Sequence, residues 1–263
     1  MKLLVFGLGY TARAFVKRLG PEWTIAGTLR GDTRVPLLPD GGFTGVTHIL
    51  VSIPPDEAGD PVLDGYGEVI AALKNLQWLG YLSTTGVYGS RDGGWVDESL
   101  ELRPTSGRAT RRATAEQQWL KLGAHVFRLA GIYGPGRSAF DGLRDGSAKR
   151  IDKPGHVFSR THVDDIARVL LASMTRPRPG AIYNVCDDEP TAQEAVVAHA
   201  ARLLGREPPP LVPFAEAGLS AMARGFWTDN KRVSNALIKK ELGVALAYPS
   251  YREGLAAILA AGG

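Results

Sequence analysis

Short apolar runs alternate along the chain with longer segments in which apolar residues recur at the spacing of an α-helix. A continuous apolar run is typical of a strand that is buried on both faces of a parallel sheet. Strands and helices in alternation indicate an α/β protein with such a sheet. The pattern predicts strands at 2–6, 23–28, 48–53, 78–83, 125–129 and 181–185, and helices at 10–19, 62–76, 109–122 and 191–204, the last with Thr191 as its N-cap.

The second half of the chain has a different residue pattern, because glycine and proline interrupt the apolar runs after Ile132. A further helix is expected to end near Gly243, with Ser234 or Asn235 as its candidate N-cap. These changes predict a main domain and a smaller C-terminal lobe. The predicted division is 1–133 with 160–186 for the main domain, and 134–159 with 187–263 for the lobe.

A glycine-rich turn joins the first predicted strand to the first predicted helix. The segment Gly7-Leu8-Gly9-Tyr10-Thr11-Ala12 matches the pattern G-x-G-x-x-G/A in the context that a dinucleotide site requires. Gly7 permits the tight turn, Gly9 lets the backbone approach a pyrophosphate, and Ala12 is small enough for the helix to pack on the strand. Because the free N–H groups of the helix start bind phosphates, the sequence predicts a Rossmann cofactor site here.

The end of the second predicted strand bears on which dinucleotide binds. A site specific for NAD usually has an acidic residue about 20 positions beyond the glycine turn. Here the chain reads Thr28-Leu29-Arg30, and an arginine beside a hydroxyl can pair with a 2′-phosphate. This favours NADP over NAD. In the alternative, Arg30 is a solvated loop residue and Asp32 binds the ribose.

Four further stretches follow in a distinctive order: YLSTTGVYG at 81–89, RLAGIYGPGR at 128–137, HVDDIA at 162–167 and IYNV at 182–185. Together with the glycine turn, they resemble the extended short-chain dehydrogenase/reductases, in particular the NAD-dependent epimerase/dehydratase branch and its atypical members. The resemblance implies a Rossmann-type, doubly wound parallel sheet of about seven strands with a small C-terminal substrate lobe. It also implies cofactor contacts at the strand ends, from Ser52, Ile53, Pro54, Ser83, Ala130 and Ile132.

Thr84 occupies the position at which that family polarises the substrate oxygen, four residues before the tyrosine of the V-Y-G turn. Its neighbours Ser83 and Thr85 could share this role. The alternative is that these hydroxyl groups only cap the turn at the strand end, where serine and threonine are common.

The proton donor of that family is the tyrosine of a Y-x-x-x-K pair, whose pKa the lysine lowers. Glu116 resembles the acidic residue four positions after the lysine, so counting back places Arg112 at the lysine position and Arg108 at the tyrosine position. A guanidinium can hold the nicotinamide ribose, but it cannot donate a proton near neutral pH because its pKa stays above about 12. The usual acid is therefore absent.

Several interpretations of this absence remain open. Tyr88 or Tyr133 supplies the proton, since the resemblance places both beside the nicotinamide. Otherwise the substrate needs no strong acid from the protein, or the chain is a cofactor-sensing protein that binds NADP(H) without turnover. Arg108, Arg111 and Arg112 could also be a solvated basic face of their helix.

The resemblance implies substrate contacts from Thr85, Tyr88, Tyr133 and Arg137. Arg137 resembles a residue that contacts substrate in nucleotide-sugar epimerases, so a hydroxyl-bearing substrate is expected, with a nucleotide sugar as one candidate. An ordinary surface loop is the alternative. The basic residues that could join Arg137 around a diphosphate are Arg144, Lys149 and Arg150.

Two other groups of residues have competing interpretations. His162 with Asp164 and Asp165 suggests a metal or a proton relay, but the resemblance implies a structural hydrogen bond at the start of a helix. Lys231 and Arg232 either face an anionic substrate or simply precede the helix at 236. The histidines have no ligand spacing, so no metal is expected.

The composition narrows the classes of protein to consider. The formal net charge is +4 and the basic residues are dispersed, which suits a small anionic ligand better than a nucleic acid. No apolar run has the length of a membrane span. A lone cysteine, Cys186, fits a reducing compartment, so we expect a cytoplasmic protein. A homodimer is consistent with the family resemblance.

Overall fold

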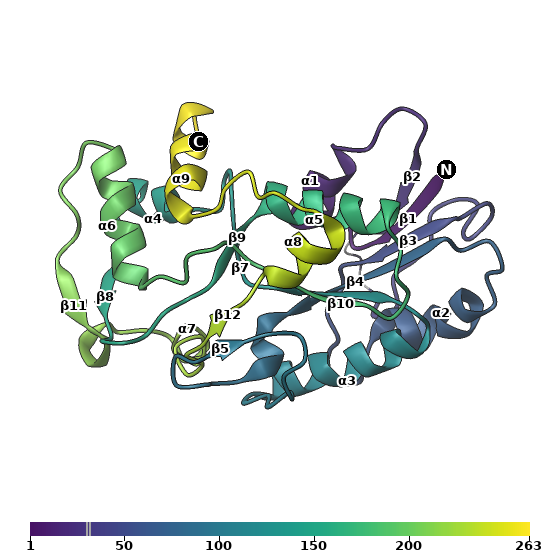
Figure 1. Ribbon diagram of the computed structural model, residues 1–263, viewed down its shortest axis with the longest axis horizontal. Coiled ribbons are helices and arrows are strands. Elements are labelled where there is room, and N and C mark those ends of the chain that lie inside the picture. The colour runs from purple at the N-terminus through teal and green to yellow at the C-terminus, as the bar shows by residue number, and fades with distance from the viewer. Residues whose placement is uncertain (30, 32) are drawn as a thin grey trace.

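A parallel sheet of six strands forms the centre of the computed structural model, which describes residues 1–29, 31 and 33–263 (Figure 1). Each described strand of this sheet runs parallel to its neighbours. The structure confirms the strands predicted from the apolar runs. In spatial order they are β10 (Ile182–Val185), β6 (His125–Leu129), β4 (Trp78–Thr84), β3 (His48–Val51), β1 (Lys2–Phe6) and β2 (Thr24–Gly27).

Helices cover both faces of the sheet, which confirms the doubly wound fold (Figure 1). Leu3 and Val5 of β1 pack in one apolar core, with residues of α1 and α5. Leu4 and Phe6 point the other way and pack with residues of α2 and α3. This alternation explains why β1 is apolar at every position except its first. The four helices are α1 (Tyr10–Val16), α5 (Val163–Thr175), α2 (Pro61–Ala71) and α3 (Gly107–Lys121).

The sheet has six strands among the described residues, one fewer than the approximate seven expected. In the usual Rossmann order, the third strand lies outside the second, and the fourth lies on the other side of the first. Here the third strand of the chain, β3, already pairs with β1 on that other side. The described residues between β2 and β3 form turns but no strand, so β2 is the edge of the sheet.

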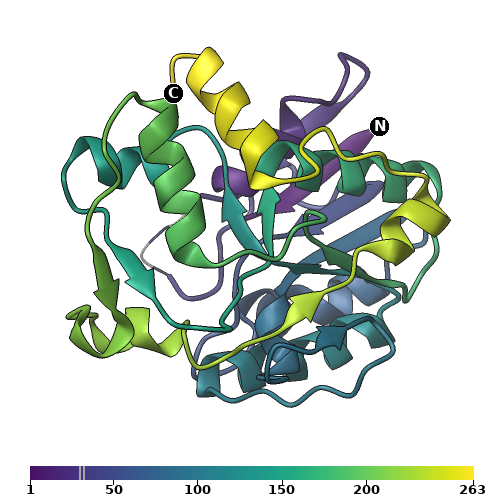
Figure 2. The ribbon, with the colours of Figure 1, turned by 60° about the vertical axis from the view of Figure 1, so that its left-hand side comes forward.

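The C-terminal part has its own apolar core, in which α4, α6 and α9 meet around Phe140, Ala200 and Leu255. Figure 2 shows α6 and α9 beside each other. The division into domains remains a prediction. The other elements are η1 (Thr85–Tyr88), β5 (Trp95–Val96), β7 (Gly131–Tyr133), α4 (Ala139–Arg144), β8 (Arg150–Asp152), β9 (Arg160–His162), α6 (Gln193–Leu203), β11 (Leu211–Pro213), η2 (Phe214–Glu216), α7 (Ala221–Gly225), β12 (Arg232–Val233), α8 (Ala236–Leu242) and α9 (Tyr251–Ala260).

Two predicted helix starts have different outcomes. Thr191 is not the N-cap of α6, because its backbone pairs with Phe158 and its hydroxyl donates to the Glu189 carbonyl at 2.8 Å. Asn235 occupies the N-cap position of α8, but the Ala236 N–H donates to the Ser234 hydroxyl at 3.3 Å. The helix α8 ends at Gly243 as predicted, in the left-handed region with φ of +66°.

Candidate functional site

Gly7 begins a tight turn at the carboxyl end of β1. Its φ of +88° favours glycine, and a Cβ there would lie 2.8 Å from Cγ1 of Ile53. The Gly7 N–H donates to the hydroxyl oxygen of Thr28 at 2.9 Å, and the Leu8 N–H donates to the Thr28 carbonyl at 2.9 Å. Thr28, predicted to contact the cofactor, therefore holds the turn from the end of β2.

Gly9 has a different environment. Its φ of −88° is open to any residue, and a Cβ there would have no described atom within 4 Å. The helix α1 begins at Tyr10 with no side-chain cap and no acidic residue in its first turn, so its first N–H groups are available to an anion. The buried Thr11 and Ala12 attach this helix start to the core. The protein's own packing does not require glycine at position 9, whereas a closely bound phosphate does.

The other predicted cofactor contacts follow neighbouring strands on the same edge of the sheet. Their strands, β3, β4 and β6, lie side by side next to β1, and all end on the side of the glycine turn. Arg30 and Asp32, on which the choice between NADP and NAD was based, lie outside the described residues. The residues at the strand ends are Ser52, Ile53 and Pro54 after β3, Ser83 in β4, and Ala130 and Ile132 after β6.

Thr84 ends β4 and is half-buried. Its hydroxyl oxygen accepts the Gly86 N–H at 3.1 Å and so caps η1. A hydroxyl that accepts one bond can still donate its own hydrogen, so the capping role and a substrate contact are compatible. Thr85, the next residue, is also half-buried at the start of η1.

A buried polar network lies beneath this strand end. Arg128 of β6 forms an ion pair with Glu116 of α3 at 2.8 Å, and the side chains are 3% and 0% exposed. The Ser83 hydroxyl donates to Glu116, which accepts bonds from both β4 and β6. Arg128 also donates to the Tyr88 hydroxyl at 2.8 Å, and that hydroxyl donates to Asn184 of β10 at 2.8 Å. The network therefore joins three strands, α3 and η1.

The two tyrosines predicted as proton donors have engaged hydroxyl groups. Tyr88 is fully buried between Arg128 and Asn184, and its burial raises the pKa of the phenol. Tyr133 donates to the Ser250 carbonyl at 3.3 Å, and burial also raises its pKa. A donor near neutral pH needs the opposite shift and a free path to substrate. We therefore assign the proton to neither residue.

The structure separates the two arginines at the tyrosine and lysine positions. Arg112 is buried and donates to the Leu82 carbonyl at 2.8 Å and to the Tyr81 hydroxyl at 3.2 Å, beside the end of β4. Arg108 is exposed in the first turn of α3. The interpretation as a solvated face therefore fits Arg108 and does not fit Arg112.

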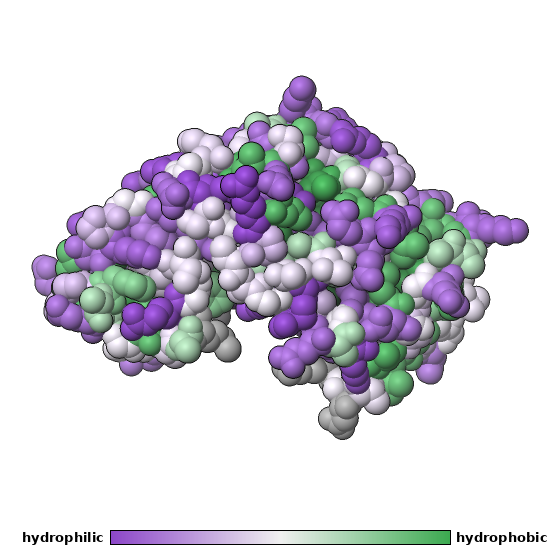
Figure 3. Space-filling model, turned by 90° about the horizontal axis from the view of Figure 1, so that it is seen from below, coloured by the Kyte–Doolittle hydropathy of each residue, from purple (hydrophilic) through white to green (hydrophobic). Residues whose placement is uncertain are grey.

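A pocket of about 410 Å³ is lined by the β7–β9 pair, the segment 136–141, α6 and α9. The Arg137 guanidinium lies 5.9 Å from the centre of the Tyr10 ring, and the Tyr10 hydroxyl donates to the Pro135 carbonyl at 3.1 Å. The pocket thus adjoins the start of α1. Seen from below, the surface is hollowed between the end that carries α6 and β11 and the end that carries the sheet (Figure 3). The lining residues include Tyr133, Arg137, Arg160, Gln193, Val197 and Tyr251.

Arg160 is a pocket residue that the sequence reasoning missed. Its guanidinium donates to the carbonyls of Phe158 and Thr191, each at 2.9 Å, and burial lowers its pKa. The sequence signal was its place two residues before His162. In the structure, Arg160 lies opposite Gly131 in the β7–β9 pair. Arg128 was missed as well, although a charged residue inside an apolar strand indicates a buried partner.

The basic residues expected around a diphosphate are used elsewhere. Arg144 donates to the Gly263 carbonyl, Lys149 donates to the Ala217 carbonyl at 2.8 Å, and Arg150 pairs with Glu194 at 3.1 Å. These contacts tie the three side chains to the C-terminal part of the chain, and the pocket beside Arg137 is lined by other residues. The structure therefore favours the surface-loop alternative for these three residues.

The remaining polar candidates have structural contacts. The His162 ring accepts the Asp164 N–H at 3.2 Å and so caps α5, while Asp165 accepts the N–H groups of Ala247 and Tyr248. Lys231 pairs with Asp229 at 3.1 Å, and Arg232 donates to the Gly93 carbonyl. Among the described residues, no group of histidine, cysteine or carboxylate side chains has the geometry of a metal site. Within the same residues, no helix has the length and apolar character of a membrane span.

Comparison with curated proteins gives partial matches, and no family model matches the sequence. Protein YeeZ of Escherichia coli is 30% identical over 175 residues, which are 64% of this chain and 58% of YeeZ. A 3-diazoavenalumate denitrifying reductase of Streptomyces is 32% identical over 165 residues, 56% of this chain and 52% of the reductase. The chain thus spans little more than half the length of either relative.

Solved structures match over the whole chain. Dehydratase and epimerase structures are below 25% identity and so show the fold alone. The dTDP-glucose 4,6-dehydratase of Bacillus anthracis with NAD has a TM-score of 0.75 at 19% identity, with 97% of this chain and 94% of that one covered. The human epimerase family protein SDR39U1 with NADPH has a TM-score of 0.73 at 15% identity, with 98% of this chain and 99% of that one covered. A functionally unknown protein from Silicibacter pomeroyi has a TM-score of 0.93 and 53% identity, with 99% of this chain and 98% of that chain covered. The chain belongs to the same family as the Silicibacter protein, and this family has the fold of the extended short-chain dehydrogenase/reductases.

Proposed function

We propose that the chain binds NADP(H), or alternatively NAD(H), at the carboxyl edge of its sheet and acts as an oxidoreductase or epimerase on a hydroxyl-bearing substrate. The main support for this proposal is the open space around Gly9, because no described atom of the protein requires glycine at that position. The complexes of the dehydratase with NAD and of SDR39U1 with NADPH support it. The reductase name of the Streptomyces relative supports the reaction class.

The residues present fit such a cofactor. The first N–H groups of α1 would hold the pyrophosphate, and the ends of β3, β4 and β6 would line the path to the nicotinamide. Bound there, a nicotinamide dinucleotide supplies or accepts a hydride. Arg112, beside the end of β4, gives this edge a fixed positive charge.

The protein's own chemistry in this proposal centres on Thr84. Its hydroxyl would donate to the substrate oxygen, at the end of β4 where the strand meets η1. The pocket beside Arg137 and Arg160 would hold the substrate, and their charges favour an anionic one, including a nucleotide sugar. Since neither Tyr88 nor Tyr133 offers a free hydroxyl, we propose no tyrosine acid.

Titration of the purified chain with NADPH and NADH tests the cofactor proposal. We expect binding of both, with NADPH the tighter, because Arg30 follows Thr28 at the end of β2. Hydride transfer from labelled NADPH to a panel of carbonyl and nucleotide-sugar substrates tests the reaction. Binding with no transfer in the whole panel would indicate a cofactor-sensing protein without turnover. Failure to bind either dinucleotide would refute the proposal.

Replacing Thr84 by alanine is expected to lower kcat by roughly 100-fold, the usual cost of losing one hydroxyl donor at the reacting oxygen. The Kd for NADPH should stay unchanged, and Thr84→Ser should restore most of the activity because it keeps the hydroxyl. Thr175→Ala, at the exposed end of α5, is the matched control. A kcat for Thr84→Ala equal to that of the control would remove Thr84 from the mechanism.

A further inference from the structure

The six-stranded sheet leaves one end of the proposed cofactor groove without its usual wall. In a Rossmann fold, the adenosine half lies at the carboxyl ends of the first two strands, where the second strand contacts the ribose. Here β2 is the edge strand, and the described residues after it form no further strand. Another part of the chain must therefore enclose an adenosine bound there.

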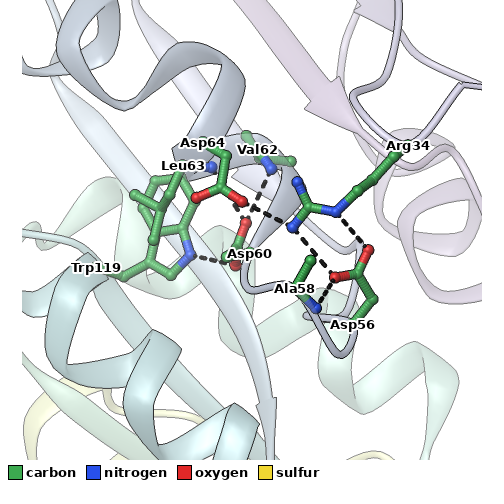
Figure 4. Close-up of polar contacts among 8 residues, drawn as sticks. All are labelled: Arg34, Asp56, Ala58, Asp60, Val62, Leu63, Asp64 and Trp119. Carbon is green, nitrogen blue, oxygen red and sulfur yellow. Dashed lines mark hydrogen bonds and ion pairs between the residues drawn. The ribbon is translucent and has the colours of Figure 1, made fainter.

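The segment 33–36 follows β2 and contacts both α2 and the loop that precedes it. Arg34 donates to both carboxylate oxygens of Asp56, at 2.8 and 3.1 Å, and to Asp64 at 2.7 Å (Figure 4). The Tyr66 hydroxyl donates to the Pro36 carbonyl at 2.7 Å. Val35 lies so close to α2 that a Cβ on Gly65 would be 2.3 Å from its Cγ1.

These contacts join the two strands that flank the glycine turn. Arg34 follows β2, Asp56 follows β3, and β1 lies between those two strands in the sheet. Gly7 begins its turn at the carboxyl end of β1, so the Arg34–Asp56 bond links the segments on either side of it. The segment 33–36 therefore lies at the end of the sheet where the adenosine half would bind.

The residues that Arg34 contacts lie in a segment that is itself held by hydrogen bonds. Asp60 caps α2 by accepting the Val62 and Leu63 N–H groups, and it accepts the Trp119 indole N–H of α3 at 2.9 Å (Figure 4). Asp56 is fixed by the Ala58 N–H at 2.8 Å. The segment 33–36 is thus tied to a fixed support.

We propose that 33–36 is a strap that closes the adenosine end of the cofactor groove in place of the missing strand, with Arg34 as its latch. The proposal rests on the proposed binding of a dinucleotide. Arg34 holds the pKa of Asp56 below its usual range, so the latch is charged at neutral pH. Because exposed ion pairs are individually weak, the strap can open for cofactor entry and close behind it.

The chain offers a matched pair of glycines in α2 for the test. Gly65→Ala places a methyl against Val35 and displaces the strap, whereas a Cβ on Gly67 meets only Leu63 at an ordinary 3.6 Å. Alanine favours the helix at both positions by about 1 kcal/mol or less, so Gly67→Ala should not lower Tm. In Gly65→Ala this gain offsets part of the cost of displacing Val35, so its Tm should fall only slightly. Gly65→Ala should weaken binding of NADPH and of the probe ADP by roughly tenfold, mainly through faster dissociation, and Gly67→Ala should not.

Arg34→Ala tests the latch independently of α2. We expect a similar tenfold loss for NADPH and ADP, with no loss for Arg178→Ala, which removes an exposed ion pair with Glu241 before β10. If the wild type binds NADPH and both strap variants bind equally well, the strap is refuted and the proposed function stands. If the wild type binds no dinucleotide, both proposals fall.

Discussion

Glu116→Ala is expected to lower the free energy of unfolding by about 3 to 5 kcal/mol, because it leaves the Arg128 charge buried without its carboxylate. The loss also removes the acceptor of the Ser83 hydroxyl and loosens the support of Tyr88. For a chain of this size, Tm should fall by roughly 10 °C. Chemical denaturation followed by circular dichroism measures the change.

Two control variants distinguish the loss of the buried Glu116–Arg128 ion pair from the loss of any charged side chain. Glu101→Ala removes the exposed partner of Arg103, and we expect a change of about 1 kcal/mol or less. The double variant Glu116→Leu with Arg128→Met should recover part of the stability, since it leaves no unpaired buried charge. A single variant as stable as the Glu101→Ala control would contradict the structural role of the pair.

Most of the sheet was predictable because its strands are buried on both faces. The run Leu3-Leu4-Val5-Phe6 has no polar position, since each face of β1 meets a layer of helices. The glycine turn was predictable for a similar local reason. Its glycine pattern lies within one strand–turn–helix unit, although Thr28 and Ile53, which surround Gly7, come from the ends of two other strands.

The missing strand was not predictable from pattern alone. The stretch between β2 and β3 contains apolar residues such as Val35 and Leu38, and nothing local shows whether they pair in a sheet. The structure shows that Val35 packs on α2 and that Leu38 lies against the core beneath it. Whether this stretch forms a strand therefore depends on its packing against α2, which the local sequence does not show.

The arginines of α3 show that residue spacing alone does not predict burial, because burial also depends on where a residue lies along the helix. Arg108 and Arg112 are one turn apart on the same face of α3, so spacing treats them alike. The helix begins at the carboxyl edge of the sheet and returns alongside β4, because it connects two parallel strands. Arg108 therefore lies beyond the edge in solvent, and Arg112 lies against β4.

Residues far away in the sequence determine whether the hydroxyl groups of Tyr88 and Tyr133 are free. The Tyr88 hydroxyl meets Asn184, 96 positions away in the sequence, and Tyr133 meets Ser250, 117 positions away. A family resemblance can bring both tyrosines to the edge of the sheet, but whether a hydroxyl is free depends on these distant residues. The same holds for the three basic residues that the C-terminal lobe uses.

Gly9→Ala is expected to weaken NADPH binding by roughly 100-fold, the equivalent of losing about one hydrogen bond to a charged phosphate. The methyl would occupy the space through which the backbone approaches the pyrophosphate. Because no described atom lies within 4 Å of that position and the φ is −88°, folding should be unaffected. Gly7→Ala is a poorer test, since strain and the contact with Ile53 would also destabilise the turn.

Gly225→Ala is the matched control for Gly9→Ala, because a Cβ there also has no described neighbour within 4 Å. It lies in α7, away from the sheet edge. Equal Tm values for both variants and the wild type, with NADPH affinity lost only in Gly9→Ala, would show that a ligand rather than the fold requires glycine at position 9. Undiminished affinity in Gly9→Ala would mean that the dinucleotide binds elsewhere, and the strap beside the same turn would lose its ligand as well.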